Sequence, residues 1–290
     1  MKNKMAETLN LINPNDPLSC KYEISKFPDG QQSIKIVEHN YCTFYSLSEQ
    51  KHPITIYSRM NSFKDVELII CATQALRDIG VKRIKLYVPY FIGGRSDRKF
   101  SSGGINYIKQ VIAPIINSQG YEAVGVMDPH SDVIEACINN FRKISTEKLI
   151  TFALKDYNQD KICLISPDAG AYKKIFDVAK MFKINNIITA NKVRNLDSGR
   201  ILKTEVPSLE KYNDDIKFVI VDDIGDGFNT FIEIAKTIRE TKPNNKIYLI
   251  VTHSIQSSGL DKALIFFEKI YTTNSICDWE KNNLKVLNVF

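Results

Sequence analysis

Three aspartates lie between a strand-like run and a helix-like run in residues 218–238, FVIVDDIGDGFNTFIEIAKTI. The first four residues are apolar and mostly β-branched, and from Thr230 apolar residues recur at helical spacing. The segment between them therefore follows a strand and leads into a helix, where open α/β sheets bind ligands and backbone N–H groups favour an anion such as phosphate. The carboxylates of Asp222, Asp223 and Asp226 suit sugar hydroxyls or a metal ion instead.

Two further loops after predicted strands carry clustered positive charge. Residues 87–100 (YVPYFIGGRSDRKF) place two arginines and a lysine on a glycine-containing loop, and residues 189–195 (TANKVRN) place Lys192 and Arg194 after a strand. The arginine fork matches phosphate oxygens, so the first cluster suits a triphosphate. A solvated surface loop explains the first cluster equally well, and it is the commoner explanation for the lysine–arginine pair.

Two other loops offer a histidine and carboxylates. In residues 126–132 (VMDPHSD), His130 stands between two aspartates, where it is either structural or a ligand of a metal ion or phosphate. In residues 164–174 (LISPDAGAYKK), a proline and a glycine predict a tight turn that presents Asp168. The five loops share one position in the predicted fold, the carboxyl end of a strand, which favours a common ligand site.

The composition predicts a globular protein without a membrane span. Of 290 residues, 43% are apolar and 25% charged, with a formal net charge of +6. The basic residues are dispersed, so polyanionic small molecules are favoured over nucleic acid as partners. Six scattered cysteines without a C-x-x-C pair indicate reduced thiols. No apolar run reaches ~20 residues and the N-terminus is polar, so we expect a cytoplasmic protein.

Strand-like and helix-like stretches alternate along the chain. Strands are predicted at 54–57, 83–88, 122–127, 161–166, 186–190, 218–221 and 246–252, and helices at 62–79, at 171–182 and from 230. Strands separated by helices of this length indicate doubly wound parallel sheets. We therefore predict an α/β fold of two domains, residues 1–152 and 153–276, with the boundary in a polar stretch at 151–159.

The segment VIVDDIGDGFNT resembles the PRPP-binding signature of phosphoribosyltransferases and of ribose-phosphate diphosphokinases (PRPP synthetases). Further motifs of the second family occur in order and at similar spacing, namely FPDGQ (27–31), GGRSDRKF (93–100), DPHS (128–131), SPDAG (166–170) and NKVR (191–194). The resemblance continues to VTHS (251–254). The chain is thus identified as a divergent member of the PRPP synthetase family. The resemblance implies two phosphoribosyltransferase-like domains, with a tail, 277–290, that packs on the first.

Members of this family use Mg²⁺ and ATP to transfer diphosphate to the C1 hydroxyl of ribose 5-phosphate, releasing AMP. The resemblance makes Lys192 and Arg194 the catalytic pair that stabilises transition-state charge. It assigns Mg²⁺ to His130 and Asp168. It assigns ATP to Phe27, Asp29, Gln31, Arg95, Ser96, Asp97 and His130. It assigns the ribose phosphate, held by carboxylates and backbone, to Asp222, Asp223, Asp226, Gly227, Phe228, Asn229 and Thr230. The adenine contact comes from a neighbouring subunit, which implies a homo-oligomer (dimer or hexamer) with a shared nucleotide site.

The chain departs from the family pattern mainly in the acceptor loop. The family reads D-T-x-G-T, whereas here Gly227 replaces a hydroxyl donor, and Phe228 and Asn229 replace small residues. Ser96 also replaces a Gln and Gln31 a Glu. Ribose 5-phosphate is the first expected acceptor. The alternative is a larger ester such as ADP-ribose, in NAD metabolism, for which Phe228 would stack on or make room for the added group.

Two other classes of protein remain as alternatives. An inactive regulatory homologue would be expected to lose the lysine–arginine pair or the metal ligands, yet Lys192, Arg194, His130 and Asp168 are all present. A plain phosphoribosyltransferase would consume PRPP without ATP, and it would not need the nucleotide-binding motifs of the N-terminal half. The sequence therefore favours the diphosphokinase.

Overall fold

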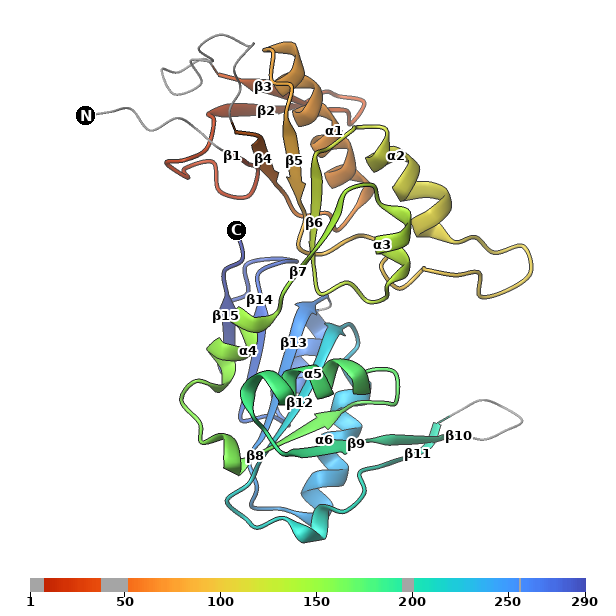
Figure 1. Ribbon diagram of the computed structural model, residues 1–290, viewed down its shortest axis with the longest axis vertical. Helices are drawn as coiled ribbons and strands as arrows, with labels where there is room; N and C mark the ends of the chain where they lie inside the picture. Colours follow the sequence, from red (N-terminus) through yellow and green to blue (C-terminus); the bar gives the residue numbers. More distant parts are fainter. Residues whose placement is uncertain (1–7, 38–51, 195–200, 256) are drawn as a thin grey trace. The chain divides into compact units, whose positions relative to one another are not determined.

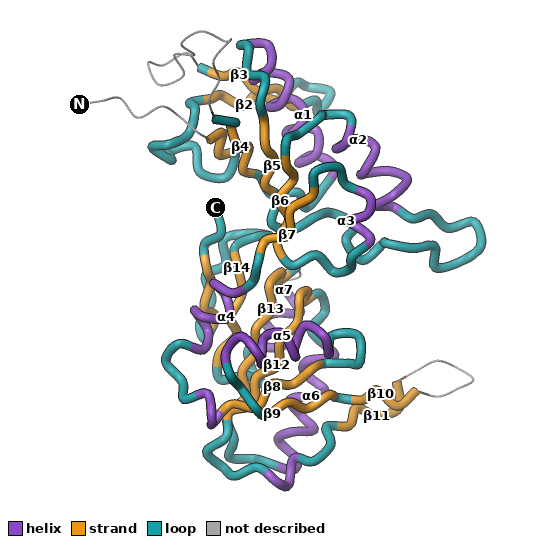
Figure 2. Tube along the Cα trace, in the orientation of Figure 1, coloured by secondary structure: helices purple, strands orange, loops and turns teal. Residues whose placement is uncertain are grey.

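The computed structural model describes residues 8–37, 52–194, 201–255 and 257–290, and its contacts divide the chain into two units. The first unit comprises residues 1–145 together with Phe290, and the second comprises residues 146–289. Each unit contains one extended parallel sheet with helices packed against it (Figures 1 and 2). The prediction of an α/β fold with two parallel sheets is confirmed.

The first unit is built on a five-stranded sheet in the order β1-β4-β5-β6-β7, in which every pairing is parallel. Its strands are β1 (Thr8–Asn10), β4 (Ile54–Tyr57), β5 (Ile84–Tyr87), β6 (Ala123–Met127) and β7 (Phe141–Ile144). The helices are α1 (Phe63–Asp78), the π-helix η1 (Ile108–Ile112), α2 (Ala113–Asn117) and α3 (Val133–Cys137). An antiparallel hairpin, β2 (Tyr22–Lys26) and β3 (Gln32–Ile36), packs against α1.

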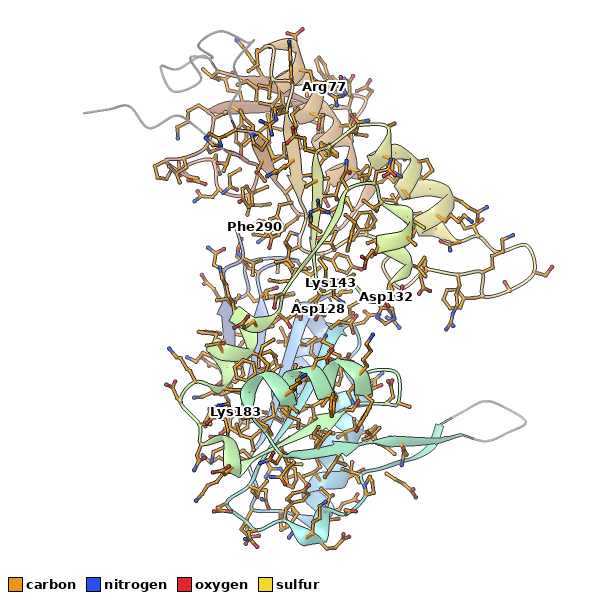
Figure 3. All side chains as sticks on the ribbon, viewed as in Figure 1. Arg77, Asp128, Asp132, Lys143, Lys183 and Phe290 are labelled. Carbon is orange, nitrogen blue, oxygen red and sulfur yellow. The ribbon has the colours of Figure 1, made fainter. Side chains whose placement is uncertain are left out.

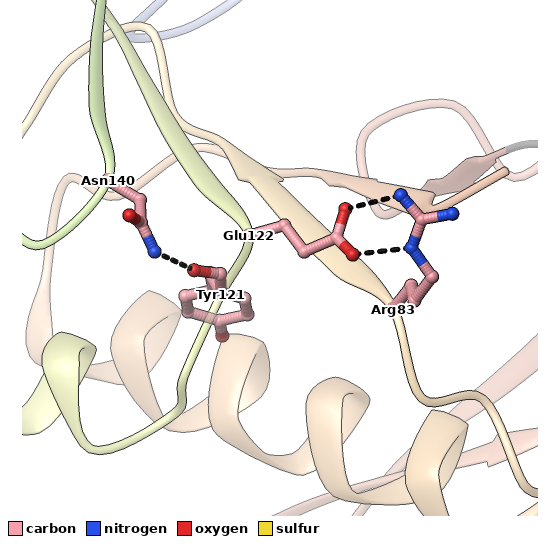
Figure 4. Close-up of polar contacts among 4 residues, drawn as sticks. All are labelled: Arg83, Tyr121, Glu122 and Asn140. Atoms are coloured by element: carbon pink, nitrogen blue, oxygen red, sulfur yellow. Dashed lines mark hydrogen bonds and ion pairs between the residues drawn. The ribbon is translucent and has the colours of Figure 1, made fainter.

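Local sequence explains where the elements of the first unit begin and end. The Asp65 carboxylate accepts a hydrogen bond from the backbone N–H of Ser62 at 2.8 Å, which satisfies a donor at the start of α1. Gly80, at φ +92°, ends the helix in a conformation that glycine adopts without strain. Figure 4 shows Arg83 and Glu122, which stand just before β5 and β6, joined as an ion pair. This pair is partly exposed and contributes little to stability.

The second unit is built on a six-stranded sheet in the order β15-β14-β13-β12-β8-β9, again parallel throughout. The strands are β8 (Ile162–Ser166), β9 (Asn186–Thr189), β12 (Lys217–Gly225), β13 (Ile247–Ser254), β14 (Lys269–Thr273) and β15 (Leu284–Leu287). The helices are α4 (Glu147–Leu154), α5 (Tyr172–Phe182), α6 (Asn229–Thr241) and α7 (Ser257–Ala263), with short 3-10 turns at Gln159–Lys161 and Leu209–Lys211. A separate antiparallel hairpin, β10 (Asn191–Arg194) and β11 (Ile201–Glu205), follows β9 and extends away from the sheet (Figure 1).

Both faces of the second sheet are buried, as expected for a parallel sheet covered by helices. Along β12, Phe218 and Ile220 belong to the apolar cluster that includes α6, whereas Val219 and Val221 belong to the cluster that includes α4 and α5. All four side chains are at most 1% exposed. The central strand is therefore fixed from both sides, which gives a firm base to whatever follows its carboxyl end.

The structure adds two details at the expected domain boundaries. The polar stretch 151–159 begins inside α4, which buries Leu149 and Ile150 among other residues. In the tail 277–290, expected to pack on the first domain, β15 pairs with β14 in the second unit, and only Phe290 groups with the first unit. Among the helices of the described ranges, none has the length and apolar character needed to cross a membrane.

Candidate functional site

The loop after β12 has the position that the sequence predicted. β12 ends at Gly225, residues 226–228 form the β12–α6 loop, and α6 begins at Asn229. The loop residues Asp226 and Gly227 are partly exposed, and in the first turn of α6 Asn229 is exposed and Thr230 partly exposed. Backbone N–H groups of a first helical turn have no partner within the helix. The loop and helix start can therefore offer N–H groups to an anion.

Asp222 and Asp223 form a carboxylate pair at the end of β12. The backbone N–H of Asp223 donates to Asp222 Oδ1 at 2.9 Å, and Asp223 is only 9% exposed. Burial raises the pKa of the Asp222 carboxyl well above its usual range, and the neighbouring Asp223 carboxylate raises it further. The Lys174 ammonium acts in the opposite direction and lowers this pKa. Such a pair can accept hydrogen bonds from two adjacent hydroxyls of a sugar.

Phe228 does not present its ring to a ligand. Its backbone is left-handed, with φ +59°, and its side chain is 2% exposed, inside the apolar core of the second unit. The ring makes an edge-on contact with Phe231 at a centroid separation of 5.9 Å. The ring is therefore not placed to stack on a larger acceptor, which was one of the two roles expected of Phe228. What Phe228 can offer to a ligand is its backbone.

Asp168 follows β8, the strand next to β12. Its carboxylate is partly exposed, and Oδ1 accepts a hydrogen bond from the Ala171 backbone N–H at 3.2 Å. The fully buried Ser166 hydroxyl donates to the Asp168 carbonyl at 2.7 Å, which fixes the turn. Because β8 and β12 are parallel neighbours, Asp168 and the β12–α6 loop follow the same edge of the sheet.

Lys192 and Arg194 belong to β10, which follows β9, the neighbour of β8. The backbone pairs Lys192 with Thr204 and Arg194 with Ile201, and the register shifts between Val193 and Arg194. The residues predicted from the second half of the chain thus lie at the end of, or follow, three neighbouring parallel strands, in the order β12, β8 and β9. This juxtaposition is the main structural support for a shared site.

Phe27, Asp29 and Gln31, which the family resemblance assigns to ATP, form the tip of the β2–β3 hairpin in the first unit. The Gln31 backbone N–H donates to Asp29 Oδ1 at 3.1 Å, and the Phe27 N–H donates to the Gln31 carbonyl at 2.9 Å. The Phe27 ring is 50% exposed. An exposed aromatic ring on a well-defined turn can stack on a planar group.

Arg95, Ser96 and Asp97, which the family resemblance also assigns to ATP, follow β5 in the first unit. Arg95 is exposed, whereas Ser96 and Asp97 are partly buried. The Ser96 N–H donates to the Gly93 carbonyl at 2.7 Å, and the Asn106 side-chain amide donates to the Asp97 carbonyl at 2.5 Å. These bonds fold the loop back toward η1, so the arginine stands on a defined turn.

The DPHS segment (128–131) follows β6 in the first unit, and Figure 3 labels its first residue, Asp128, and Asp132, which comes directly after it. Asp128 is buried and left-handed (φ +46°), whereas His130 is exposed. The Ser131 Oγ is buried without a hydrogen-bond partner among the described residues. A buried hydroxyl of this kind can bind a water molecule or a polar group of a ligand.

Asp168 offers the kind of ligand that nucleotide enzymes provide for Mg²⁺. Within the ranges that the structure describes, no group of three or more His, Cys, Asp or Glu side chains forms a cage. Mg²⁺ usually takes one or two protein carboxylates and completes its shell with water and substrate phosphates. The partly exposed carboxylate of Asp168 fits that role, and His130 is accessible.

One residue of the site was missed by the sequence analysis. Lys174 lies in the first turn of α5, six residues after Asp168, and its charge lowers the pKa of Asp222. The helical periodicity of the sequence could have revealed this residue. Ile175, Val178 and Ala179 form the buried face of α5, and Lys174 is not part of that face.

Comparisons with known proteins find distant relatives along most of the chain. No family model matches the chain. The ribose-phosphate pyrophosphokinases of Ralstonia nicotianae and Pyrococcus abyssi are each 25% identical to it, over 259 and 263 residues. Both matches cover 88% of this chain, and they cover 77% and 84% of the relatives.

The fold itself matches a solved structure. The crystal structure of phosphoribosylpyrophosphate synthetase from Mycobacterium smegmatis aligns with a TM-score of 0.78 at 16% sequence identity, covering 93% of this chain and 87% of that one. The two parallel sheets, the order of the motifs and the length of the sequence matches lead to one conclusion. The chain is a distant homologue, over most of its length, of the ribose-phosphate pyrophosphokinases.

Proposed function

We propose that this protein transfers a diphosphoryl group from ATP to the C1 hydroxyl of ribose 5-phosphate, giving PRPP and AMP. The observation that carries the proposal is the end of β12. There, a carboxylate pair, Asp222 and Asp223, is followed by the β12–α6 loop and the start of α6. The carboxylates can accept hydrogen bonds from sugar hydroxyls, and the neighbouring N–H groups can bind a terminal phosphate. Together these two features fit the two parts of a sugar phosphate.

The reaction forms a bond between the C1 oxygen and the β-phosphorus and breaks the bond from that phosphorus to the oxygen that leaves with AMP. The hydroxyl proton is released as the new bond forms. Lys192 and Arg194 would stabilise the negative charge that develops on the transferred group. Asp168 and His130 would hold Mg²⁺, which neutralises phosphate charge when it is bound.

The ATP side of the proposed site comes from the first unit. Arg95 and the turn around it would bind phosphate oxygens, and Phe27 with Asp29 would contact adenine. We also propose a homo-oligomer in which these hairpin residues complete a neighbour's nucleotide site. The exposed Phe27 ring supports this, because an exposed aromatic side chain is common at interfaces. Light scattering of the purified chain would show a monomer if this part of the proposal is wrong.

Ribose 5-phosphate is the favoured acceptor over ADP-ribose. The case for a larger acceptor is the altered loop at Gly227, Phe228 and Asn229, and burial of the Phe228 ring in the core removes the stacking contact expected of it. A larger group would have to be recognised by other residues.

The test is AMP release from ATP and Mg²⁺, with ribose 5-phosphate and ADP-ribose offered in parallel and the products identified by mass. We expect AMP and PRPP with ribose 5-phosphate alone. AMP with ADP-ribose alone would overturn the acceptor assignment. No AMP with either would favour the inactive homologue. An Asp223→Asn variant tests the role of the carboxylate pair. It removes one charge of the pair at nearly constant shape, and it should abolish turnover of the true acceptor.

A further inference from the structure

The β12–α6 loop is in close contact with the core at Gly225. A Cβ atom placed on Gly225 would lie 2.4 Å from Phe228 Cζ and 2.7 Å from Cε1, so the ring occupies the space that a side chain at residue 225 would take. The ring is 2% exposed and also contacts Phe231, which limits its freedom to move aside. Phe228 and Gly225 therefore fit each other at the base of the loop.

The same loop is in close contact with α7 at a second point. A Cβ atom on Gly259 would lie 2.6 Å from the Asp226 carbonyl oxygen and 3.0 Å from the Gly227 Cα. These neighbours are backbone atoms, so they cannot turn away as a side chain would. The segment before α7 is also tied to the loop, because the Ile255 N–H donates to the Gly225 carbonyl at 2.7 Å.

We propose that these two contacts form a clamp that holds the β12–α6 loop in its phosphate-binding shape before the acceptor arrives. Phe228 and Gly259 are then positioning residues, and neither contacts the substrate through a side chain. The inference rests on the proposed function, because it assumes that the loop receives the phosphate of ribose 5-phosphate. The clamp also gives a reason for the backbone of Phe228, which has φ +59°, a conformation that bulky residues rarely adopt.

A clamped loop has a measurable consequence for affinity. Ordering even one backbone residue upon binding weakens a complex by about tenfold, so a loop that is already ordered binds its ligand more tightly. Loss of either contact of the clamp should therefore raise the Kd for ribose 5-phosphate by about tenfold. The affinity for ATP, which is assigned to the first unit, should not change.

The experiment is calorimetric titration of ribose 5-phosphate into the full chain, loaded with Mg²⁺ and the unreactive analogue α,β-methylene-ATP. The variants are Phe228→Leu, Gly259→Ala and Gly225→Ala. Phe218→Leu is the control for loss of a buried ring in the same core cluster, since Phe218 lies at the opposite end of β12. Ser258→Ala is the control for α7, because Ser258 is exposed. A melting curve for each variant verifies that it is folded.

We expect about tenfold weaker binding for the three clamp variants and wild-type binding for both controls. The double variant Gly225→Ala/Phe228→Leu should bind more tightly than Gly225→Ala alone, because the smaller side chain vacates the space for the new Cβ. Wild-type affinity in folded Phe228→Leu and Gly259→Ala would overturn the clamp. Equal weakening in Phe218→Leu would overturn it too, since the effect would then be general. Failure of the wild-type chain to bind ribose 5-phosphate would instead overturn the proposed acceptor.

Discussion

Restoring the hydroxyl that the acceptor loop lacks should strengthen acceptor binding. The family signature has a threonine where this chain has Gly227. A Cβ atom on Gly227 would meet only Asn229 Nδ2, at 3.6 Å, which is an ordinary van der Waals contact. The backbone of Gly227 also does not have a positive φ. The backbone should therefore accept Gly227→Thr without a clash.

The size of the gain follows from the charge of the ligand and the exposure of the site. A hydrogen bond to a charged group contributes about 1.5–3 kcal/mol, which corresponds to roughly ten- to hundredfold in Kd. Gly227 is only partly buried, so water competes for the phosphate oxygens. We therefore expect the lower end of this range, about a tenfold decrease in the Kd for ribose 5-phosphate.

The assay is calorimetric titration of ribose 5-phosphate into wild type, Gly227→Thr and Gly227→Val. Valine has nearly the shape of threonine but no hydroxyl, so the difference between the two variants isolates the hydrogen bond. Tighter binding in both would mean that restricting the backbone was responsible. Unchanged or weaker binding in Gly227→Thr would refute the assumption that residue 227 faces the phosphate.

Three further outcomes are expected. Because burial raises the folded pKa of Asp222 above its unfolded value, stability falls as the pH rises from the unfolded pKa toward the folded pKa. Asp222→Asn should therefore raise the Tm at pH 7 but not at pH 3, where the carboxyl is protonated in both states. Burial raises the pKa of the Cys163 thiol from 9.0 to about 11, so up to about 2–3 kcal/mol of stability should be lost as the pH rises from 9 to 11, and urea titrations should show a smaller loss in Cys163→Ala. Lys183 ends α5 at φ +56°, a left-handed conformation that glycine adopts without strain. Lys183→Gly should therefore raise the free energy of unfolding by about 1 kcal/mol. A decrease would show that the lysine side chain contributes more to stability than the backbone strain costs.

The sequence predicts those elements of the fold whose pattern is local. The strand at 54–57 corresponds to β4, and the helix expected at 62–79 is α1, Phe63–Asp78. Both have an apolar periodicity that can be read without knowing their neighbours. The same holds for the carboxylate pair and the loop after β12, because a strand that changes into a helix can be recognised along the chain.

Elements that depend on distant partners were not predicted. β1 has three residues, and its strand character comes from parallel pairing with β4. The β10–β11 hairpin contains the proposed catalytic pair, yet its strands pair only with each other and have no apolar alternation that would reveal them. The direction of the Phe228 ring was also beyond the sequence, because it depends on the space left by Gly225.

The central place of β12 in its sheet has a consequence for folding. β12 pairs with β8, which precedes it by a long stretch of chain, and with β13, which follows α6. Non-local parallel pairings form slowly because loop-closure entropy must be overcome first. We therefore expect the edge that carries Asp222 and the β12–α6 loop to be completed late in folding. A sugar phosphate that binds this edge would bind only chains in which the edge is complete. By mass action it should therefore raise the yield of native protein during refolding.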